Sequence, residues 1–476
     1  MPDARRSLVR PLSRSSLPLQ EQLYQRLRDA ITEGRLAPGE RLPAVRTLAS
    51  DLGVARGTAE SAYARLAGEG YLVPRGPAGT IVSPSLRLEM LRRPTPPKET
   101  ARPAESDLRE PLPFQLGLPA LDQFPRTLWA RLTARAGRRL SAALLAYQDA
   151  MGLPELRQAI ASYLAVSRGV RCQPGQVLIT GGYQAGLDLI VRLLLTPGDE
   201  VWFEEPGYFL ARQQLQATGI VLRPIPVDED GLDVEAGRRL APAAKLAIVT
   251  PAHQSPLGVA LSLPRRQALL GWAAETGAWI VEDDYDGEFH YVGRKLPALK
   301  SLDSADRVIY AGSFSKTIFP SLRLGYLVLP MALLQGAAAA RRRTLHGEPV
   351  LGQMVTADFL AEGHFGRHLK RMRTLYAARR QALVRALGDS FGDQLEIATR
   401  PGGMQLLARF PTSQDDLVLA HRAASRGFAA TALSSQYLGR KREHGLLLGF
   451  TNIPEQQALA IAHALRQAVS DLLPRP

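Results

Sequence analysis

The sequence predicts a multidomain protein: a small N-terminal domain of helices and a hairpin, then a long α/β domain that ends in a smaller α/β subdomain. Three observations predict this. Up to about Ser83, three helical patterns precede two short apolar runs around a Pro/Gly turn. A Pro-rich stretch then interrupts the periodicity, and from Phe114 strand-like runs alternate with amphipathic helices. At 476 residues the chain is also too long for one ordinary core.

The N-terminal domain, residues 1–83, is expected to form three helices and a β-hairpin. The run LQEQLYQRLRDAITEG has apolar residues at helical spacing and ends at Gly34. A second helix, VRTLASDLG, stops at Gly53, and a third, ARGTAESAYARLAGEG, runs to Gly70. The run YLVPRGPAGTIVS then reads as two strands around a turn. This order predicts a winged helix-turn-helix, in which the third helix enters the major groove of DNA.

The expected DNA contacts lie at the start of the third helix, at the start of the second helix and in the turn of the hairpin: Arg56, Gly57, Thr58, Arg46, Arg75 and Gly76. Glycine suits the turn because it bends sharply and lets backbone N–H groups approach phosphate. The net charge of +14 fits a polyanionic partner such as DNA. An Arg-rich chain is also what a GC-rich genome produces, so charge alone leaves both explanations open.

The segment LPAVRTLASDLGVARGTAESAYARLAGEGYL resembles the GntR-type DNA-binding domain. The resemblance implies binding to double-stranded promoter DNA. Val45 stands where that family usually has an acidic residue before the arginine of the second helix. Residues 84–113 follow as a linker with seven prolines, a composition that favours a semi-extended tether.

Residues 114–476 show an α/β pattern. The strand-like runs include QVLIT, DEVWF, IVLRPI, LAIVTP, AWIVED and VIYAG, with amphipathic helices between them. This alternation predicts a mostly parallel sheet covered by helices. From about residue 345 to 476, long helical patterns and the runs MQLLARF and LLLGFT predict the smaller α/β subdomain.

The stretch SFSKTIFPSLRLGY contains the residues with the most telling chemistry. Ser313, Ser315 and Arg323 supply neutral and charged donors that suit a phosphate group. Lys316 supplies an amine that can form an imine with an aldehyde cofactor. A serine-rich loop with two solvated cations is the alternative for these residues taken alone.

Other expected site residues follow the carboxyl ends of strands, where open α/β sheets bind ligands. The run QVLIT leads into Gly181–Gln184 at the start of a helix, whose free N–H groups suit a phosphate. Tyr208 follows DEVWF and can stack on a flat ring. The run AWIV leads into four acids within Glu282–Asp286, which are costly to bury unless they are paired.

With these motifs in this order, the second domain resembles a fold-type I aminotransferase domain that uses pyridoxal 5'-phosphate (PLP). The whole chain resembles the MocR/GabR family of bacterial transcriptional regulators. The resemblance implies that Lys316 holds PLP as an internal aldimine and that Asp283 pairs with its ring nitrogen. Further cofactor contacts implied by the resemblance are Tyr285 and Ser255 at the ring oxygen, Tyr208 on the ring face, Gly182, Tyr183, Gln184, Ser313, Ser315 and Arg323 at the phosphate, and Tyr147 at the phosphate of a partner subunit.

Three positions depart from the aminotransferase pattern. Ser255, in SPLG, stands where an asparagine is common, and Leu447, in LLLGF, stands where an arginine holds the substrate carboxylate. Leu210 stands where the γ-aminobutyrate-sensing member of the family is expected to carry an arginine. The cofactor site is therefore expected to be complete and the amino-acid clamp absent. Candidate replacement cations are Arg212, Arg400 and His253.

These patterns predict a homodimeric, cytoplasmic transcriptional regulator that senses a small-molecule effector, either PLP itself or an amine or amino acid. Cys172 is the one cysteine, which fits a reducing compartment, and neither a membrane span nor a metal site is expected. Two alternatives remain at this stage. One is a working PLP-dependent aminotransferase with a DNA-binding head, and the other is a DNA-binding protein whose second domain only dimerises.

Overall fold

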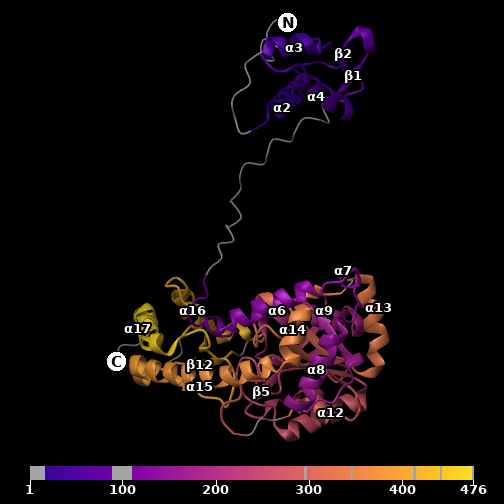
Figure 1. The fold of residues 1–476 in the computed structure, drawn as a ribbon. Helices are drawn as coiled ribbons and strands as arrows, with labels where there is room; N and C mark the ends of the chain where they lie inside the picture. Colours follow the sequence, from indigo (N-terminus) through magenta and orange to yellow (C-terminus); the bar gives the residue numbers. More distant parts are fainter. Residues whose placement is uncertain are drawn as a thin grey trace. The chain divides into compact units, whose positions relative to one another are not determined.

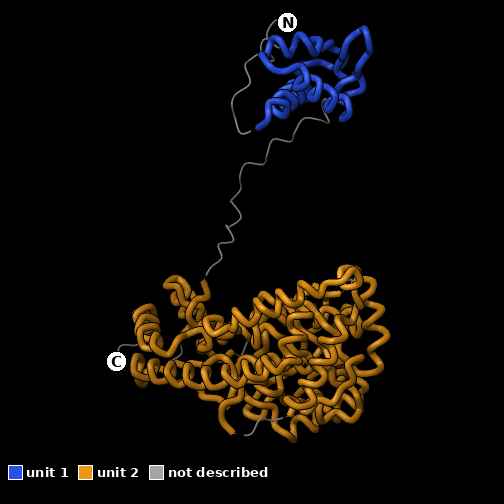
Figure 2. Tube along the Cα trace, viewed as in Figure 1, with its two compact units in different colours: residues 1–109 blue, residues 110–476 orange. Residues whose placement is uncertain are grey.

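The computed structural model describes residues 17–87, 110–293, 297–344, 347–410, 414–439 and 442–473. The chain divides into two compact units, residues 1–109 and 110–476 (Figure 2). Each unit buries its own set of apolar side chains. Most of the predicted linker, residues 88–109, lies outside the described residues, and Glu110–Pro113 belong to the second unit.

The N-terminal unit is a winged helix-turn-helix, as predicted (Figure 1). Leucines of all three helices form its core together with Leu72 and Val82 of the hairpin. Gly53 ends the second helix in the left-handed conformation (φ 63°), which glycine adopts without steric cost. The elements are α2 (Leu19–Thr32), α3 (Val45–Leu52), α4 (Arg56–Gly68), β1 (Leu72–Pro74) and β2 (Thr80–Val82).

The large sheet of the second unit has the strand order β3-β10-β9-β8-β7-β4-β5-β6. The pairings from β9 to β5 are parallel, and β10 lies antiparallel between β3 and β9. The strands are β3 (Val177–Thr180), β4 (Glu200–Glu205), β5 (Val221–Asp228), β6 (Gly231–Leu232), β7 (Leu246–Val249), β8 (Trp279–Asp284), β9 (Val308–Ser313) and β10 (Gly325–Val328).

Helices cover both faces of this sheet, because alternate residues of its strands are buried on opposite sides. One face packs against α8 and α14 at one end and against α11 and α12 at the other, whereas α9, α10 and α13 cover the opposite face. The helices are α6 (Arg126–Arg138), α7 (Ala142–Leu145), α8 (Pro154–Ser167), α9 (Tyr183–Leu194), α10 (Phe209–Ala217), α11 (Val234–Leu240), α12 (Leu263–Thr276), α13 (Leu334–Thr344) and α14 (Val350–Ala361).

The small subdomain is built on a second, four-stranded antiparallel sheet of order β11-β12-β14-β13. Because α14 packs on α8 and α6, the chain leaves the large sheet along α15 rather than at about residue 345. Figure 1 shows the long α15 (orange) beside α17. The elements are α15 (His364–Phe391), β11 (Glu396–Ala398), β12 (Gln405–Arg409), α16 (Asp416–Ala424), β13 (Thr431–Ala432), β14 (Leu446–Gly449) and α17 (Ala458–Val469).

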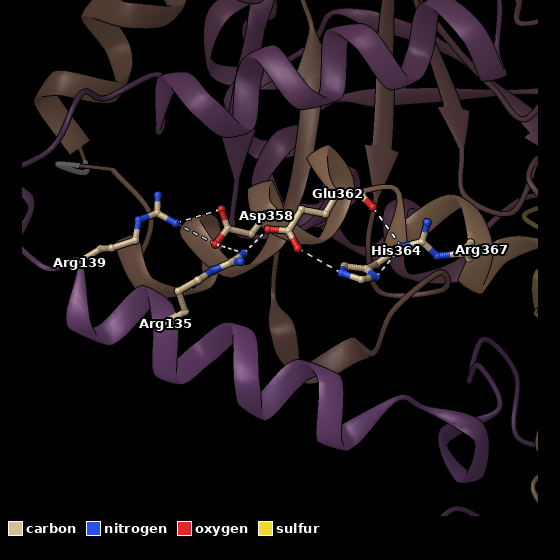
Figure 3. Close-up of polar contacts among 6 residues, drawn as sticks. All are labelled: Arg135, Arg139, Asp358, Glu362, His364 and Arg367. Carbon is tan, nitrogen blue, oxygen red and sulfur yellow. Dashed lines mark hydrogen bonds and ion pairs between the residues drawn. The ribbon is translucent and has the colours of Figure 1, made fainter.

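A chain of polar contacts joins α6 to α14 and to the start of α15 (Figure 3). Asp358 accepts hydrogen bonds from Arg135 (2.9 Å) and Arg139 (2.8 Å). Glu362 faces His364 at 3.2 Å, and the imidazole Nδ1 of His364 lies 2.7 Å from the guanidinium of Arg367. These contacts fix the base of α15, the helix that carries the small subdomain.

The first residues of the second unit pack against the small sheet. The Ala429 N–H group donates to the Pro113 carbonyl oxygen, and the Gly449 N–H group donates to that of Phe114, both at 2.9 Å. Phe114 is fully buried. This packing brings the segment that follows, with Gly117, to the end of strand β9, where Lys316 contacts it. Across the described ranges, no helix combines the length and the apolar character that a membrane crossing needs.

Candidate functional site

A cavity of about 460 Å³ lies at the carboxyl ends of the large-sheet strands. Its walls come from that sheet, from the first residues of the second unit and from the small subdomain. The structure brings the following predicted residues together on it: Gly182, Tyr183, Gln184, Tyr208, Ser255, Asp283, Tyr285, Ser313, Ser315, Lys316 and Arg323.

Lys316 follows β9 and points at the N-terminal segment of the unit. Its Nζ donates a hydrogen bond to the Gly117 carbonyl oxygen at 3.0 Å. A Cβ atom on Gly117 would lie 1.8 Å from this Nζ, so the close approach requires glycine. Burial lowers the pKa of Lys316, while the charges of Asp286 and Asp283 oppose the change. A lowered pKa increases the fraction of neutral, nucleophilic amine.

Hydrogen-bond donors for an anion gather at one end of the cavity because β10 pairs with both β3 and β9. In this register Gly325 lies opposite both Thr180 and Ser313, which brings the two strand ends together. Gly182, at φ 96°, is the N-cap of α9 and forms no side-chain cap, so the first N–H groups of α9 remain available.

Arg323 completes this end of the cavity. It adopts a left-handed backbone conformation (φ 50°, ψ 41°), which costs free energy for a residue other than glycine and concentrates at ligand sites. Its side chain is exposed. A guanidinium group beside two hydroxyl groups and a helix N-terminus is a set of donors suited to a phosphate group.

Acidic and aromatic side chains form another part of the cavity wall. Burial raises the pKa of Asp283, at the end of β8, to about 8. Burial and the Asp283 charge raise the pKa of Tyr208 to about 12 and that of Tyr183 well above its ordinary value. A buried carboxyl group with so high a pKa gains most from a cationic partner, such as a protonated ring nitrogen.

Hydrogen bonds and an ion pair offset the predicted free-energy cost of burying the acidic residues at the end of β8. Glu282 accepts two backbone N–H groups from the turn η4 (Leu299–Leu302), at 2.7 and 2.8 Å. Asp284 forms a fully buried ion pair with Arg168, with Nε and Oδ2 2.5 Å apart. Asp283 faces the cavity and receives no such cation. Asp286 lies 3.2 Å from Nδ1 of His253, outside the described lining of the cavity. Of the four acids, Asp283 is thus the one that lines the cavity, and it is the one that the resemblance assigned to the ring nitrogen.

The small subdomain closes the cavity with uncharged side chains: Met404, Gln405, Thr431, Gln436 and Leu447. Leu447 is 1% exposed and pairs with Leu407 and Thr431 in the small sheet. Within the described part of the lining, the cationic side chains are Lys316 and Arg323. Neither lies on the small subdomain, where Leu447 replaces the carboxylate-binding arginine of the aminotransferase pattern.

The candidate replacement cations have other partners. Arg212 donates to the carbonyl oxygens of Tyr437 (2.8 Å) and Ser435 (3.0 Å). Arg400 pairs with Glu229 through two hydrogen bonds of 2.7 and 2.9 Å. Neither arginine lines the cavity, so a carboxylate there would meet neither of them.

Tyr147 lies outside this cavity, is 87% exposed and follows the short helix α7. In the N-terminal unit, the predicted DNA-contacting arginines Arg46, Arg56 and Arg75 are exposed, as are Gly57 and Gly76, whereas Thr58 is half-buried. Arg56 pairs with Glu60 at 2.8 Å, one helical turn further along α4.

Sequence reasoning missed the residues that reach the cavity from distant parts of the chain. Leu116 and Gly117 follow the Pro-rich stretch and line the cavity, but no sequence motif marks them as site residues. The glycine at position 117 was the one local feature that could have drawn attention to them. Gln405 and Gln436 belong to the small subdomain, whose placement over the large sheet no local pattern reveals.

The sequence matches two families. Residues 19–82 match the bacterial regulatory proteins of the gntR family, and residues 118–443 match aminotransferase class I and II. The probable rhizopine catabolism regulatory protein MocR of Rhizobium meliloti is 39% identical over 95% of this chain and 94% of its own. The pyridoxine biosynthesis regulator PdxR of Corynebacterium glutamicum is 35% identical over 97% of this chain and 98% of its own.

Solved aminotransferases share the fold of the second unit. The kynurenine aminotransferase of Pyrococcus horikoshii superposes with a TM-score of 0.70 at 28% identity, over 77% of this chain and 93% of its own. LysN, the α-aminoadipate aminotransferase of Thermus thermophilus, superposes with a TM-score of 0.69 at 30% identity, over 76% of this chain and 92% of its own. The chain therefore belongs to the MocR/GabR type of bacterial transcriptional regulators, in which a gntR-family winged helix precedes an aminotransferase class I and II domain.

Proposed function

We propose that this regulator binds PLP in the cavity of its second unit and senses its effector there. The observation that carries the proposal is the position of Lys316: its buried amine lies in one cavity with a phosphate-type donor set and an unpaired acid. When bound, PLP supplies an aldehyde that condenses with amines and a ring that accepts electrons.

The residues present fit this cofactor. Gly182, Ser313, Ser315 and Arg323 would hold the phosphate group, with Tyr183 and Gln184 at the start of α9 beside it. Asp283 would pair with the ring nitrogen, whereas Tyr285 and Ser255 would face the ring oxygen and Tyr208 the ring. The high pKa of Asp283 supports this assignment, because a cationic ring nitrogen would relieve its desolvation.

The effector that the cavity favours is PLP itself. An amino acid brings a carboxylate, and burying it without a cation costs on the order of several kcal/mol. Leu447 offers no such cation, Arg212 and Arg400 are engaged elsewhere, and Arg323 is assigned to the phosphate group of the cofactor. One relative that matches over nearly its full length is named for pyridoxine biosynthesis.

An amine effector is the second candidate. Gln405, Gln436 and Thr431 contribute amide and hydroxyl groups to the lining of the cavity that contains Lys316. Such groups hold a neutral or hydroxylated amine without needing a carboxylate clamp. Efficient transamination remains disfavoured, because it needs the substrate carboxylate fixed so that the reacting C–H bond is oriented over the ring. We therefore propose a sensor rather than an aminotransferase.

The arrangement of the whole protein completes the proposal. We propose a cytoplasmic homodimer in which residues 1–83 bind promoter DNA through Arg46, Arg56, Gly57, Thr58, Arg75 and Gly76, residues 84–113 serve as linker, and Tyr147 reaches the phosphate of the partner's cofactor. The exposure of Tyr147 supports this role, because a side chain that serves a partner subunit must lie on the surface.

Borohydride reduction in the presence of PLP tests the cofactor proposal. The peptide that contains Lys316 should carry the reduced cofactor, as read by mass spectrometry. Binding of the promoter fragment with and without PLP then tests its role as effector, with a panel of amines and amino acids as the comparison. A label on another lysine, or no label, contradicts the assignment. Steady amino-group turnover between common amino acids and keto acids would favour an enzyme instead.

A further inference from the structure

A buried histidine stands directly behind the cofactor cavity. The Nδ1 atom of His253 lies 3.1 Å from the Tyr285 hydroxyl oxygen and 3.2 Å from Oδ2 of Asp286. His253 is 6% exposed and Asp286 is 2% exposed. One ring nitrogen therefore faces a hydroxyl group and a carboxyl group at hydrogen-bond distance, out of reach of bulk water.

The protonation of this nitrogen decides the direction of the Tyr285 hydroxyl group. If Nδ1 carries the proton, it donates to the Tyr285 hydroxyl oxygen and cannot accept, so the hydroxyl hydrogen of Tyr285 is free to point into the cavity. If Nδ1 is bare, it accepts that hydrogen and turns it away from the cavity. The carboxylate of Asp286 lies 3.2 Å from Nδ1, and its negative charge favours the tautomer with the proton on that nitrogen.

Two glycines hold the imidazole in this position. A Cβ atom on Gly403 would lie 2.0 Å from Cε1 of His253, and one on Gly258 would lie 2.9 Å from Nε2. Gly403 comes from the small subdomain and immediately precedes Met404 and Gln405, which line the cavity. The ring is thus clamped between the turn after β7 and the segment that enters β12.

Several other charged or titratable groups lie around His253 and Asp286. A cavity of about 50 Å³, large enough for a water molecule, is lined by His253, Asp286, Arg168 and His290. Arg168 is committed to its buried ion pair with Asp284. On the other side the charge of Asp286 also raises the pKa values of Lys316, Tyr285 and Asp283. Arg400 contributes its Cγ, rather than its charged end, beside Gly258.

We propose that His253 is a positioning residue: held in one tautomer by Asp286, it directs the Tyr285 hydroxyl group into the cavity, toward the ring oxygen of the cofactor. This inference rests on the proposed function, because it needs PLP in the cavity. Since Gly403 contacts the same ring, a shift of the small subdomain would change the direction of that hydroxyl group.

Titrating the absorbance of PLP bound to the full-length protein tests the proposal. Without a directed donor the ring oxygen becomes more basic, so His253→Leu should raise the midpoint of the spectral pH titration by about one pH unit. His253→Asn places an amide N–H near the position of Nδ1 and should restore the wild-type midpoint. His253→Phe keeps a flat ring between Gly258 and Gly403 but removes Nδ1, so it should shift the midpoint upward even if His253→Leu fails to fold.

The controls separate this inference from the proposed function. His364→Leu, in the polar network at the base of α15, should leave the midpoint unchanged. Equal shifts in His253→Leu and His253→Asn would show a packing effect and overturn the positioning role, as would an unchanged midpoint in both His253→Leu and His253→Phe. Borohydride labelling of Lys316 in the same samples reports on the cofactor site. If the wild-type protein is not labelled, the proposed function fails, and the inference fails with it.

Discussion

At the scale of single residues, substitution of Lys316 should separate the proposed effector response from DNA binding. Lys316→Ala should abolish borohydride labelling and the response of DNA binding to the effector, because the amine is removed. It should leave effector-free DNA binding intact, since the winged helix has its own core. Gel-shift titrations with and without PLP measure both properties. Loss of basal DNA binding in this variant would show that Lys316 is needed for folding rather than for sensing.

Asp283 provides a pH test of the ligand-free protein. Its pKa is raised from an ordinary 3.8 to about 8, so the folded state holds a proton that the unfolded state releases. Stability from this group is therefore present at low pH and is lost as the pH rises toward 8. Asp283→Asn should raise the melting temperature by roughly 2–4 °C more at pH 8.5 than at pH 5.5. An increase that is equal at both pH values would contradict the raised pKa.

The residue types around the cavity were predictable, because each follows a strand whose apolar run is visible in the sequence. What could not be predicted is which acid stays unpaired. Asp283 and Asp284 are neighbours in one run, yet only contact with Arg168, more than one hundred residues earlier, commits Asp284 to the core. Such long-range pairing leaves no local pattern.

At the scale of elements, the start of α4 is the test of DNA recognition. Arg56→Ala should weaken promoter binding by about 1–3 kcal/mol if Arg56 reads a base. Its exposed pair with Glu60 contributes little to folding, so stability should barely change. Arg35→Ala, which removes an exposed arginine paired with Glu33 outside the predicted DNA face, is the matched control. Both should be measured at one salt concentration, because phosphate contacts depend on salt.

The strand β14 tests why amino acids are disfavoured. Leu447→Arg would place a guanidinium group in the uncharged wall of the cavity, where it can pair with a carboxylate. Amino acids should then change the spectrum of the bound cofactor at roughly tenfold lower concentration than in the wild-type protein, as expected for about 1.4 kcal/mol. Leu407→Met, a volume-conserving change on the neighbouring strand, controls for repacking.

Element patterns were clear wherever local periodicity decides structure. The three helices and the hairpin of the first unit, and the strands of the large sheet, follow their apolar runs. The antiparallel setting of β10 and the start of the small subdomain were not visible. Both depend on which neighbours a segment meets: α14 has a helical pattern like that of α15, but packing against α8 keeps it with the large sheet.

At the scale of the whole molecule, the two units are expected to fold separately, because each has its own buried core. A fragment spanning residues 110–476 should therefore retain borohydride labelling of Lys316 and lose promoter binding. A fragment spanning residues 1–87 should bind the promoter more weakly than the full chain if the second unit dimerises, since pairing two heads raises the effective concentration. Equal affinities would argue against a dimer that joins the heads.

Nζ of Lys316 donates a hydrogen bond to the carbonyl oxygen of Gly117, seven residues after the second unit begins at Glu110. A covalent bond between this nitrogen and a ligand would alter the hydrogen bond, because the nitrogen would carry fewer hydrogens to donate. A covalent bond to the lysine would thus weaken one of the contacts that hold the segment leading back toward residues 1–109, while the hydrogen bonds at Pro113 and Phe114 remain. The nitrogen atom proposed to bind the cofactor is thus also the atom that helps to hold the first residues of the second unit in place.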